Sequence, residues 1–284
     1  MQEEMTPEIY QAYIDILREE LVPAMGCTEP IALAYAAALA RQELGCLPQM
    51  VTVAVSANII KNVKSVVVPH TGGMRGIEAA VAAGAVAGDA RRQLEVLADV
   101  TPERQSELAD WREHTPITVT QADSPFLLDI DVTVAGGGHT ARVRLVGCHT
   151  NVVRVERDGQ TKLDRPCNEE QPAKGTDRSL LSVERIITFA DELNPEDVQD
   201  VLQRQIDYNT AIAEEGLRGN YGANIGRILL QAYGDDVHNR AKALAAAGSD
   251  ARMNGCELPV VINSGSGNQG LTASLPVIVY AKQL

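Results

Sequence analysis

One stretch decides the fold class: FLLDIDVTVAGGGHTARVRLVGCHTNVVRVERDGQTKL, residues 126–163. Apolar and polar residues alternate along it, and a period of two is typical of half-buried strands. Two turn signals interrupt the alternation, the segment AGGGH at 135–139 and the pair Asp158-Gly159, and both are typical of hairpins. Together with PITVTQA just upstream, this pattern predicts an antiparallel, hairpin-rich region at 116–165 that is inserted into the fold.

The segments on either side of this region are mainly helical by their periodicity. Apolar residues recur at helical spacing before and after the loop VPAMGCTEP, and helical patterns return from residue 182 onward. Two shorter runs, VTVAVSANII at 51–60 and SVVVP at 65–69, are typical of strands. The sequence therefore predicts an α+β fold in which helical segments flank a mixed or antiparallel sheet. We expect three parts: an α/β part at 1–115, the β-rich region at 116–165, and a helical part at 166–284.

The charge balance narrows the classes of partner. The chain has 25 Lys and Arg residues against 38 Asp and Glu residues, a formal net charge of -13. Such a charge repels phosphate backbones and anionic lipids, so we expect neither nucleic-acid nor membrane binding. The N-terminus begins acidic and amphipathic, without the pattern of a signal peptide, and no apolar run is long enough to span a membrane. We therefore expect a cytoplasmic protein.

The segment MGCTEP places a cysteine where a helix is expected to begin. Cys27 follows Gly26, and free backbone N–H groups at a helix N-terminus favour a thiolate. A reactive cysteine and a small buried residue after a turn are equally good interpretations of this segment alone. Glu29 is interpreted as a partner of the helix dipole.

A second candidate segment is NIIKNVKSVVVPHTGGMRG. Lys61 and Asn62 follow the predicted strand, and Arg75 lies in a glycine loop that precedes an Ala-rich helix. Backbone donors of a glycine turn together with an arginine suit a carboxylate or a small phosphate. The competing interpretation is a tight turn with solvated basic residues.

A third segment, ARMNGCELPVVINSGSGNQG, ends in a loop of small and amide residues. Its glycines let the backbone approach a ligand closely, and its amide side chains both donate and accept hydrogen bonds. We interpret it as a ligand-binding loop rather than a linker, and we expect it to meet the Cys27 loop and the 61–75 segment at one cavity. The candidate residues of this loop are Ser264, Gly265, Ser266, Gly267, Asn268, Gln269 and Gly270.

No metal site is expected within this chain. Its five cysteines are scattered, without a close pair or trio. His139 and His149 have no carboxylate or cysteine at ligand spacing and are interpreted as surface or sheet residues.

Taken together, GCTEP, SANIIKN with GGMRG, and NSGSGNQG resemble one known family over essentially the whole chain. This is the iron–sulfur-dependent L-cysteine desulfidase group, which is related to the α chain of iron–sulfur L-serine dehydratases. The resemblance implies an α,β-elimination that converts L-cysteine to sulfide, ammonia and pyruvate with the help of a [4Fe-4S] cluster. It implies that Cys27 is the base or nucleophile and that the SGSGNQG loop holds the amino-acid substrate.

The sequence departs from the family pattern at its end. In the family, the cluster cysteines lie beyond the SGNQG loop, whereas this chain ends at Leu284. We therefore expect a C-terminally truncated chain that neither holds a cluster nor eliminates sulfide by itself. An L-serine dehydratase-like lyase, or a non-catalytic module that binds a small amino acid, are the alternatives, and the sequence leaves a homo-oligomer open.

Overall fold

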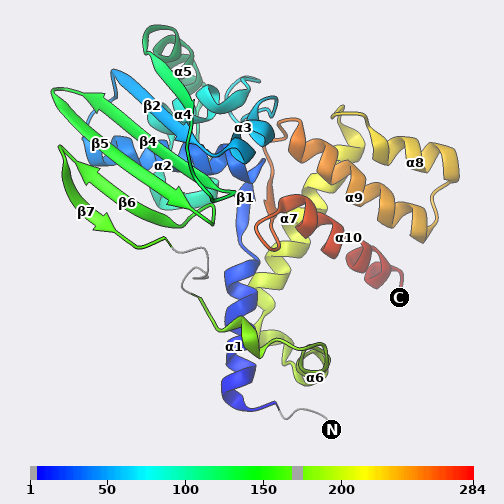
Figure 1. Cartoon of the computed structure of the whole chain (residues 1–284). Coiled ribbons are helices and arrows are strands. Elements are labelled where there is room, and N and C mark those ends of the chain that lie inside the picture. The colour runs from blue at the N-terminus through cyan, green and yellow to red at the C-terminus, as the bar shows by residue number, and fades with distance from the viewer. Residues whose placement is uncertain (1–4, 168–174) are drawn as a thin grey trace.

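The computed structural model describes residues 5–167 and 175–284, and it confirms the predicted α+β class (Figure 1). Its main feature is a six-stranded sheet in the order β3-β2-β4-β5-β6-β7. Strands β2 and β3 are parallel and every other neighbouring pair is antiparallel, so the sheet is mixed. The strands are β2 (Met50–Val55), β3 (Ile117–Gln121), β4 (Asp129–Gly136), β5 (His139–Val146), β6 (Val152–Arg157) and β7 (Gln160–Asp164).

One strand of this sheet comes from outside the β-rich region. β2 lies between β3 and β4, with Val53 opposite Val119 on one side and Val132 on the other. The hairpins at 129–164 therefore build directly on a strand from the first 115 residues. The predicted turns at Gly137 and at Asp158-Gly159 connect β4 to β5 and β6 to β7, with positive φ at each of these residues.

Two Ala-rich helices cover one face of the sheet. α2 (Thr28–Leu44) packs on β4 and β5 and against α4 (Gly76–Ala87). The two helices touch backbone to backbone, because a Cβ placed on Gly84 would lie 2.0 Å from the carbonyl oxygen of Ala34. Glycine at this position is therefore required by the helix packing, and the alanines around it keep the layer thin.

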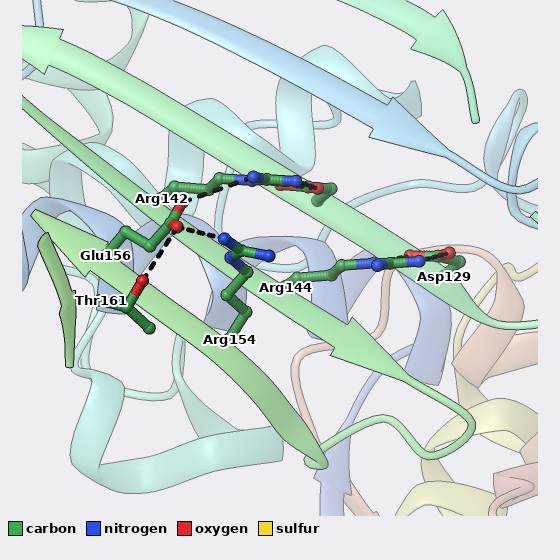
Figure 2. Close-up of polar contacts among 7 residues, drawn as sticks. Asp129, Arg142, Arg144, Arg154, Glu156 and Thr161 are labelled. Atoms are coloured by element: carbon green, nitrogen blue, oxygen red, sulfur yellow. Dashed lines mark hydrogen bonds and ion pairs between the residues drawn. The ribbon is translucent and has the colours of Figure 1, made fainter. Parts of the chain in front are cut away.

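The other face of the sheet carries charged side chains (Figure 2). Arg144 on β5 donates two hydrogen bonds to Asp129 on β4, at 2.9 and 2.6 Å. Arg142 binds Asp131 in the same bidentate way and lies 3.4 Å from Glu156. Each arginine on β5 therefore has its own acidic partner on a neighbouring strand, and these hydrogen bonds raise the pKa of Arg144 and of Arg142.

A second group of helices lies to the right and below in Figure 1: α1 (Pro7–Glu20), α6 (Val183–Glu192), α7 (Gln199–Arg218), α8 (Ile225–Tyr233), α9 (Val237–Met253) and α10 (Gly267–Gln283). α7 and α9 pack through Gly216, whose Cβ would lie 2.1 Å from the carbonyl oxygen of Ala247. Short 3-10 turns occur at Ala90–Glu95, Arg178–Leu180 and Pro195–Asp197. Two further helices, α3 (Ala57–Val63) and α5 (Pro102–His114), lie with the sheet part and pack against α4.

A small sheet joins the start of the chain to its last part. β1 (Pro23–Met25) pairs antiparallel with β8 (Pro259–Val261). The buried Asn209 on α7 fixes β8, because its Oδ1 accepts from Val261 N at 2.9 Å and its Nδ2 donates to Ser274 Oγ at 2.9 Å. The loops that precede α2 and α10 are consequently held side by side.

Two local predictions were wrong. SVVVP forms no strand, and only Val67 makes an isolated bridge, to Arg75. These valines are buried for another reason, since a Cβ on Gly255 would lie 2.6 Å from Val67 Cγ1. The predicted strand at 51–60 also ends early, because α3 begins at Ala57. No helix within the described part of the chain is long and apolar enough to cross a membrane.

Candidate functional site

The loop before α2 brings Cys27 and Glu29 together. Gly26 has a φ of +64°, and a Cβ on it would lie 2.5 Å from Pro69 Cγ, so only glycine fits this turn. Cys27 then caps α2, and its thiol donates to Glu29 Oε2 at 3.1 Å. The Glu29 carboxylate also accepts from Thr28 Oγ1 at 3.2 Å and from Asn62 Nδ2 at 3.3 Å. Glu29 is thus the centre of this hydrogen-bond group.

The Cys27 thiol is protonated, which differs from the thiolate that its place at a helix N-terminus favours. Cys27 is only 6% exposed. Its burial and, second, the neighbouring negative charge of Glu29 raise the thiol pKa to about 12. Burial works against ionisation of Glu29 too, but the hydrogen bonds from Cys27, from the Glu29 backbone and from Thr28 hold the carboxyl pKa below its ordinary value. The pair is therefore a neutral thiol donating to a carboxylate.

Arg252, in the last turn of α9, connects this loop to the one before α10. Its Nε donates to Gly26 O at 2.9 Å and its Nη1 donates to Asn268 Oδ1 at 2.9 Å. A Cβ on Gly267 would lie 2.3 Å from Arg252 Nε, so the glycine makes room for the guanidinium. The residue is 3% exposed, yet among residues 5–167 and 175–284 no carboxylate lies within ion-pair distance of it.

His149 approaches the same group from the loop between β5 and β6. Burial lowers the pKa of His149. The charge of Glu29 acts against this lowering and the charge of Arg252 adds to it, and the imidazole is therefore neutral near pH 7. Gly265 lies beside it, since a Cβ there would be 3.6 Å from His149 Cε1. The interpretation of His149 as a plain surface or sheet residue is therefore wrong, whereas His139 does lie on the surface, paired with Asp158 at 2.8 Å.

An open cavity of about 430 Å³ lies against Glu29 and His149. Its walls come from the first turn of α3, from the β3–β4 loop, and from Gly147 at the end of β5. The other lining residues are Asn58, Ile59, Pro125, Phe126, Leu127 and Leu128. A carboxylate and a neutral imidazole thus face a cavity whose other lining residues are largely apolar.

The structure brings several of the residues expected from the sequence to this place. Asn62 and Cys27 bind Glu29, Asn268 binds Arg252, and Gly265 and Gly267 let His149 and Arg252 approach. The three segments therefore do contribute to one group of residues.

Other expected residues have different positions. Lys61 is exposed, and Arg75 is exposed with its Nη1 donating to Ser65 O at 2.6 Å. Ser266 caps α10 by accepting from Gln269 N at 3.3 Å, and Gly270 packs against Val261 O. Ser264 binds Asn263 at 3.2 Å, and the side chain of Gln269 is exposed. These residues shape the loop more than they present side chains to the cavity.

Two residues of the group, Arg252 and His149, were missed by the sequence reasoning, and Glu29 was assigned only to the helix dipole. Arg252 lies in the quoted segment ARMNGCELPVV, where it is the one cation between an Ala-rich helix and a strand. A lone cation between a helix and a strand is the signal by which the sequence indicates Arg252. His149 carried no such signal, because its neighbours in the sequence are those of an ordinary β-turn.

The described residues do not fit an iron–sulfur cluster. No group of three or more His, Cys, Asp or Glu side chains within residues 5–167 and 175–284 is placed to hold a metal ion. Cys27 and Cys256 are buried, Cys46 and Cys148 are exposed, and Cys167 is intermediate.

Comparison with known proteins places the chain among relatives of one kind. The profile of the family described as "Serine dehydratase alpha chain" matches residues 91–284, which include His149 and Arg252. A UPF0597 protein of Desulfitobacterium hafniense is 54% identical over 275 residues, covering 97% of this chain and 64% of the relative. One of Lachnoclostridium phytofermentans is 51% identical over 282 residues, covering 97% and 66%.

A third relative, the UPF0597 protein of Fusobacterium nucleatum, is 45% identical over 276 residues, covering 95% of this chain and 65% of its own length. The chain thus spans slightly less than two thirds of the length of these relatives. The matched regions of all three are long enough to take in both the Cys27 loop and the loop at 264–270. No solved structure matches the chain.

Proposed function

We propose an activity for this chain from one premise: it belongs to the serine dehydratase alpha-chain family. The activity is that of a lyase that removes the α-proton and the β-substituent of a small amino acid. For L-cysteine the products are sulfide, ammonia and pyruvate. L-serine, which yields ammonia and pyruvate, is the alternative substrate.

The observation that carries this proposal is the buried charge of Arg252. A buried cation is stable when an anion and hydrogen bonds compensate it. Arg252 has hydrogen bonds to Gly26 O and Asn268 Oδ1, but no carboxylate among the described residues is paired with it. A substrate carboxylate would supply the missing anion, and a guanidinium binds a carboxylate in bidentate geometry.

Glu29 supplies the opposite charge. It is ionised, lies on the cavity wall, and is not paired with Arg252. An amino acid carries an ammonium and a carboxylate on one carbon atom, so an unpaired carboxylate and an unpaired guanidinium in one group of residues suit a zwitterion. Asn62 and Asn268 fix the orientation of Glu29 and Arg252 through their hydrogen bonds.

The reaction then requires a base, and the neutral His149 is suited to that role. His149 accepts the α-proton, the electron pair forms the Cα–Cβ double bond, and sulfur leaves with the pair of the C–S bond. The resulting aminoacrylate becomes an imine, which water hydrolyses to pyruvate and ammonia. The Cys27 thiol acts as a positioning group that holds Glu29 by donating a hydrogen bond. No step is assigned to the [4Fe-4S] cluster that the resemblance implies, and the cluster remains a proposal for the whole protein.

Titration calorimetry with L-cysteine and L-serine, together with sulfide and pyruvate assays, tests the proposal. We expect Arg252→Gln to weaken binding at least roughly 30-fold, the equivalent of about 2 kcal/mol. The matched control is Arg41→Gln, because Arg41 is a partly buried arginine that donates to Gly88 O, outside the site. Equal binding by the Arg252 variant and the unchanged chain would refute the proposed carboxylate site.

A second candidate, a module that binds a small amino acid without turnover, is favoured by the buried, protonated Cys27. The two candidates differ in one measurement. Binding without pyruvate or sulfide from the chain of residues 1–284 supports the module, or the predicted inactivity of this chain alone. Pyruvate production by this chain would refute the module and the expected inactivity of this chain, and it would support the lyase.

A further inference from the structure

The cavity beside Glu29 is larger than the amino acids that the proposed reaction consumes. It measures about 430 Å³, whereas a water molecule occupies roughly 30 Å³ in the liquid. Cavities of roughly 300–1,000 Å³ are typical of sites that enclose much larger ligands than cysteine. A substrate of the size of cysteine or serine would leave most of this space to solvent.

The cavity is lined by both polar and apolar side chains. Its lining includes the polar side chains of Glu29 and His149 together with the apolar side chains of Ile59, Phe126 and Leu127. Leu127 is 77% exposed, so a leucine side chain stands in water beside the opening. An apolar group of a ligand that covered these side chains would be stabilised by removal of apolar surface from water.

The backbone of this wall is held in place from both sides. Ser56 Oγ donates to Leu127 O at 2.7 Å, and Gly147 N donates to Leu128 O at 3.0 Å. Phe126 N donates to Ser124 Oγ at 3.3 Å. The apolar side chains are therefore presented by a preorganised loop, which lowers the entropy cost of binding.

We propose that the preferred substrates are S-substituted L-cysteines, whose sulfur carries an apolar alkyl or benzyl group. This rests on the proposed function, since the zwitterionic end is bound by Glu29 and Arg252 as above. The substituent occupies the apolar wall formed by Phe126 and Leu127. His149 accepts the α-proton and the C–S bond breaks with its electron pair on sulfur. The leaving thiolate takes a proton from water, and hydrolysis of the imine gives pyruvate and ammonia.

The test compares L-cysteine, S-methyl-L-cysteine and S-benzyl-L-cysteine by titration calorimetry, with pyruvate and free thiol assayed in parallel. We expect S-benzyl-L-cysteine to bind at least about ten-fold more tightly than L-cysteine. Leu127→Ser should remove most of this preference, measured as the ratio of the dissociation constants of L-cysteine and S-benzyl-L-cysteine. Leu47→Ser is the matched control, because Leu47 is also an exposed leucine but does not line the cavity.

The outcomes separate the two proposals. L-cysteine binding as tightly as the S-benzyl compound would overturn the inference about the substrate class and leave the lyase proposal standing. Retention of the preference in Leu127→Ser would also overturn it, because the apolar wall would not be its source. Failure of all three compounds to bind or react would overturn both proposals.

Discussion

Two regions of the molecule bury arginine side chains, and they compensate the arginine charge in different ways. On the sheet face, Arg144 is matched by Asp129 through two hydrogen bonds (Figure 2). At the junction of α9 and α10, Arg252 is more deeply buried, and its acceptors within the described residues are the carbonyl of Gly26, the amide oxygen of Asn268 and the sulfur of Met253. A buried structural ion pair requires that its two charges compensate each other, as those of Arg144 and Asp129 do on the sheet face. Among residues 5–167 and 175–284 Arg252 makes no ion pair, although the nearby charge of Glu29 partly opposes the lowering of its pKa by burial, and this arrangement is what the proposed site for an anionic group requires.

The largest expected effect tests the sheet face. Arg144→Gln would leave Asp129, which is 1% exposed, as a buried and unpaired carboxylate. We expect a loss of about 3–5 kcal/mol in the free energy of unfolding, measured by urea denaturation. Amino-acid binding should be unchanged.

Replacing the whole pair, with Asp129→Leu and Arg144→Met together, should cost much less than the single change. Arg91→Gln, which breaks the exposed pair with Asp89, is the control and should leave the denaturation midpoint unchanged. If the double variant is as unstable as the single one, the pair is not the source of the effect.

The next effect tests the site by the same measurement. Arg252→Met removes a cation that has no carboxylate partner among the described residues, so the loss comes from the oxygens of Gly26 and Asn268 that lose their donor. We expect about 1–3 kcal/mol, less than for Arg144. A loss larger than that of Arg144→Gln would mean that Arg252 is mainly structural and would break the comparison.

A smaller effect concerns the pH dependence of stability. The native pKa of His149 lies below its ordinary value of 6.5, mainly because of burial. As the pH falls below about 6.5, the unfolded chain binds a proton at this residue before the native state does. The free energy of unfolding therefore decreases as the pH falls from about 6.5 to the native pKa. The slope from this one group is at most about 1.4 kcal/mol per pH unit.

We expect His149→Gln to flatten the denaturation profile between roughly pH 5 and 7. His114→Gln is an informative control of opposite sign, because the Asp110 carbonyl and carboxylate raise the pKa of His114. The stability that His114 contributes is present below its ordinary pKa and is lost as the pH rises. An unchanged profile for His149→Gln would mean that its imidazole is solvated.

The smallest change is expected at Cys27. Alkylation at pH 8 followed by mass spectrometry should label the exposed Cys46 and Cys148 first and Cys27 slowly, because its thiol pKa is about 12. Glu29→Gln should increase the Cys27 rate only modestly, since burial is the first cause of the raised pKa and the Glu29 charge the second. Labelling of Cys27 as fast as that of Cys46 would contradict the geometry of the site.

The comparison also explains what could be predicted from the sequence. Alternation and turn residues identify β4 to β7, because each strand buries one face and its hairpins need positive φ at particular glycines. The parallel pairing of β2 with β3 has no such local signal, since it depends on how α4 and α5 cross between them. SVVVP looked like a strand because its valines are buried, but Val67 packs against Gly255 and makes only an isolated bridge, to Arg75.

The site was predicted where the chemistry is local and missed where it depends on tertiary contacts. GCTEP and SGSGNQG stand out because glycines and amides cluster within a few residues. His149 and Arg252 are single residues in ordinary surroundings, and only the folded chain shows that they approach Glu29. Lys61 and Arg75 show the converse, since basic residues beside a glycine loop were expected to bind a ligand and are exposed instead.

The pairing of β1 with β8 has a consequence for the newly synthesised chain. Gly26 and Arg252, which share a hydrogen bond, are 226 positions apart in the sequence. At about 5–20 residues per second, the ribosome makes Arg252 roughly 10–45 seconds after Gly26. During that interval the whole six-stranded sheet is available to fold, whereas the Cys27 loop and the edge of β1 wait without their partners. We therefore expect the site to be assembled late, on a sheet that is already complete, and β1 to be the part of the nascent chain that most needs protection from wrong pairing.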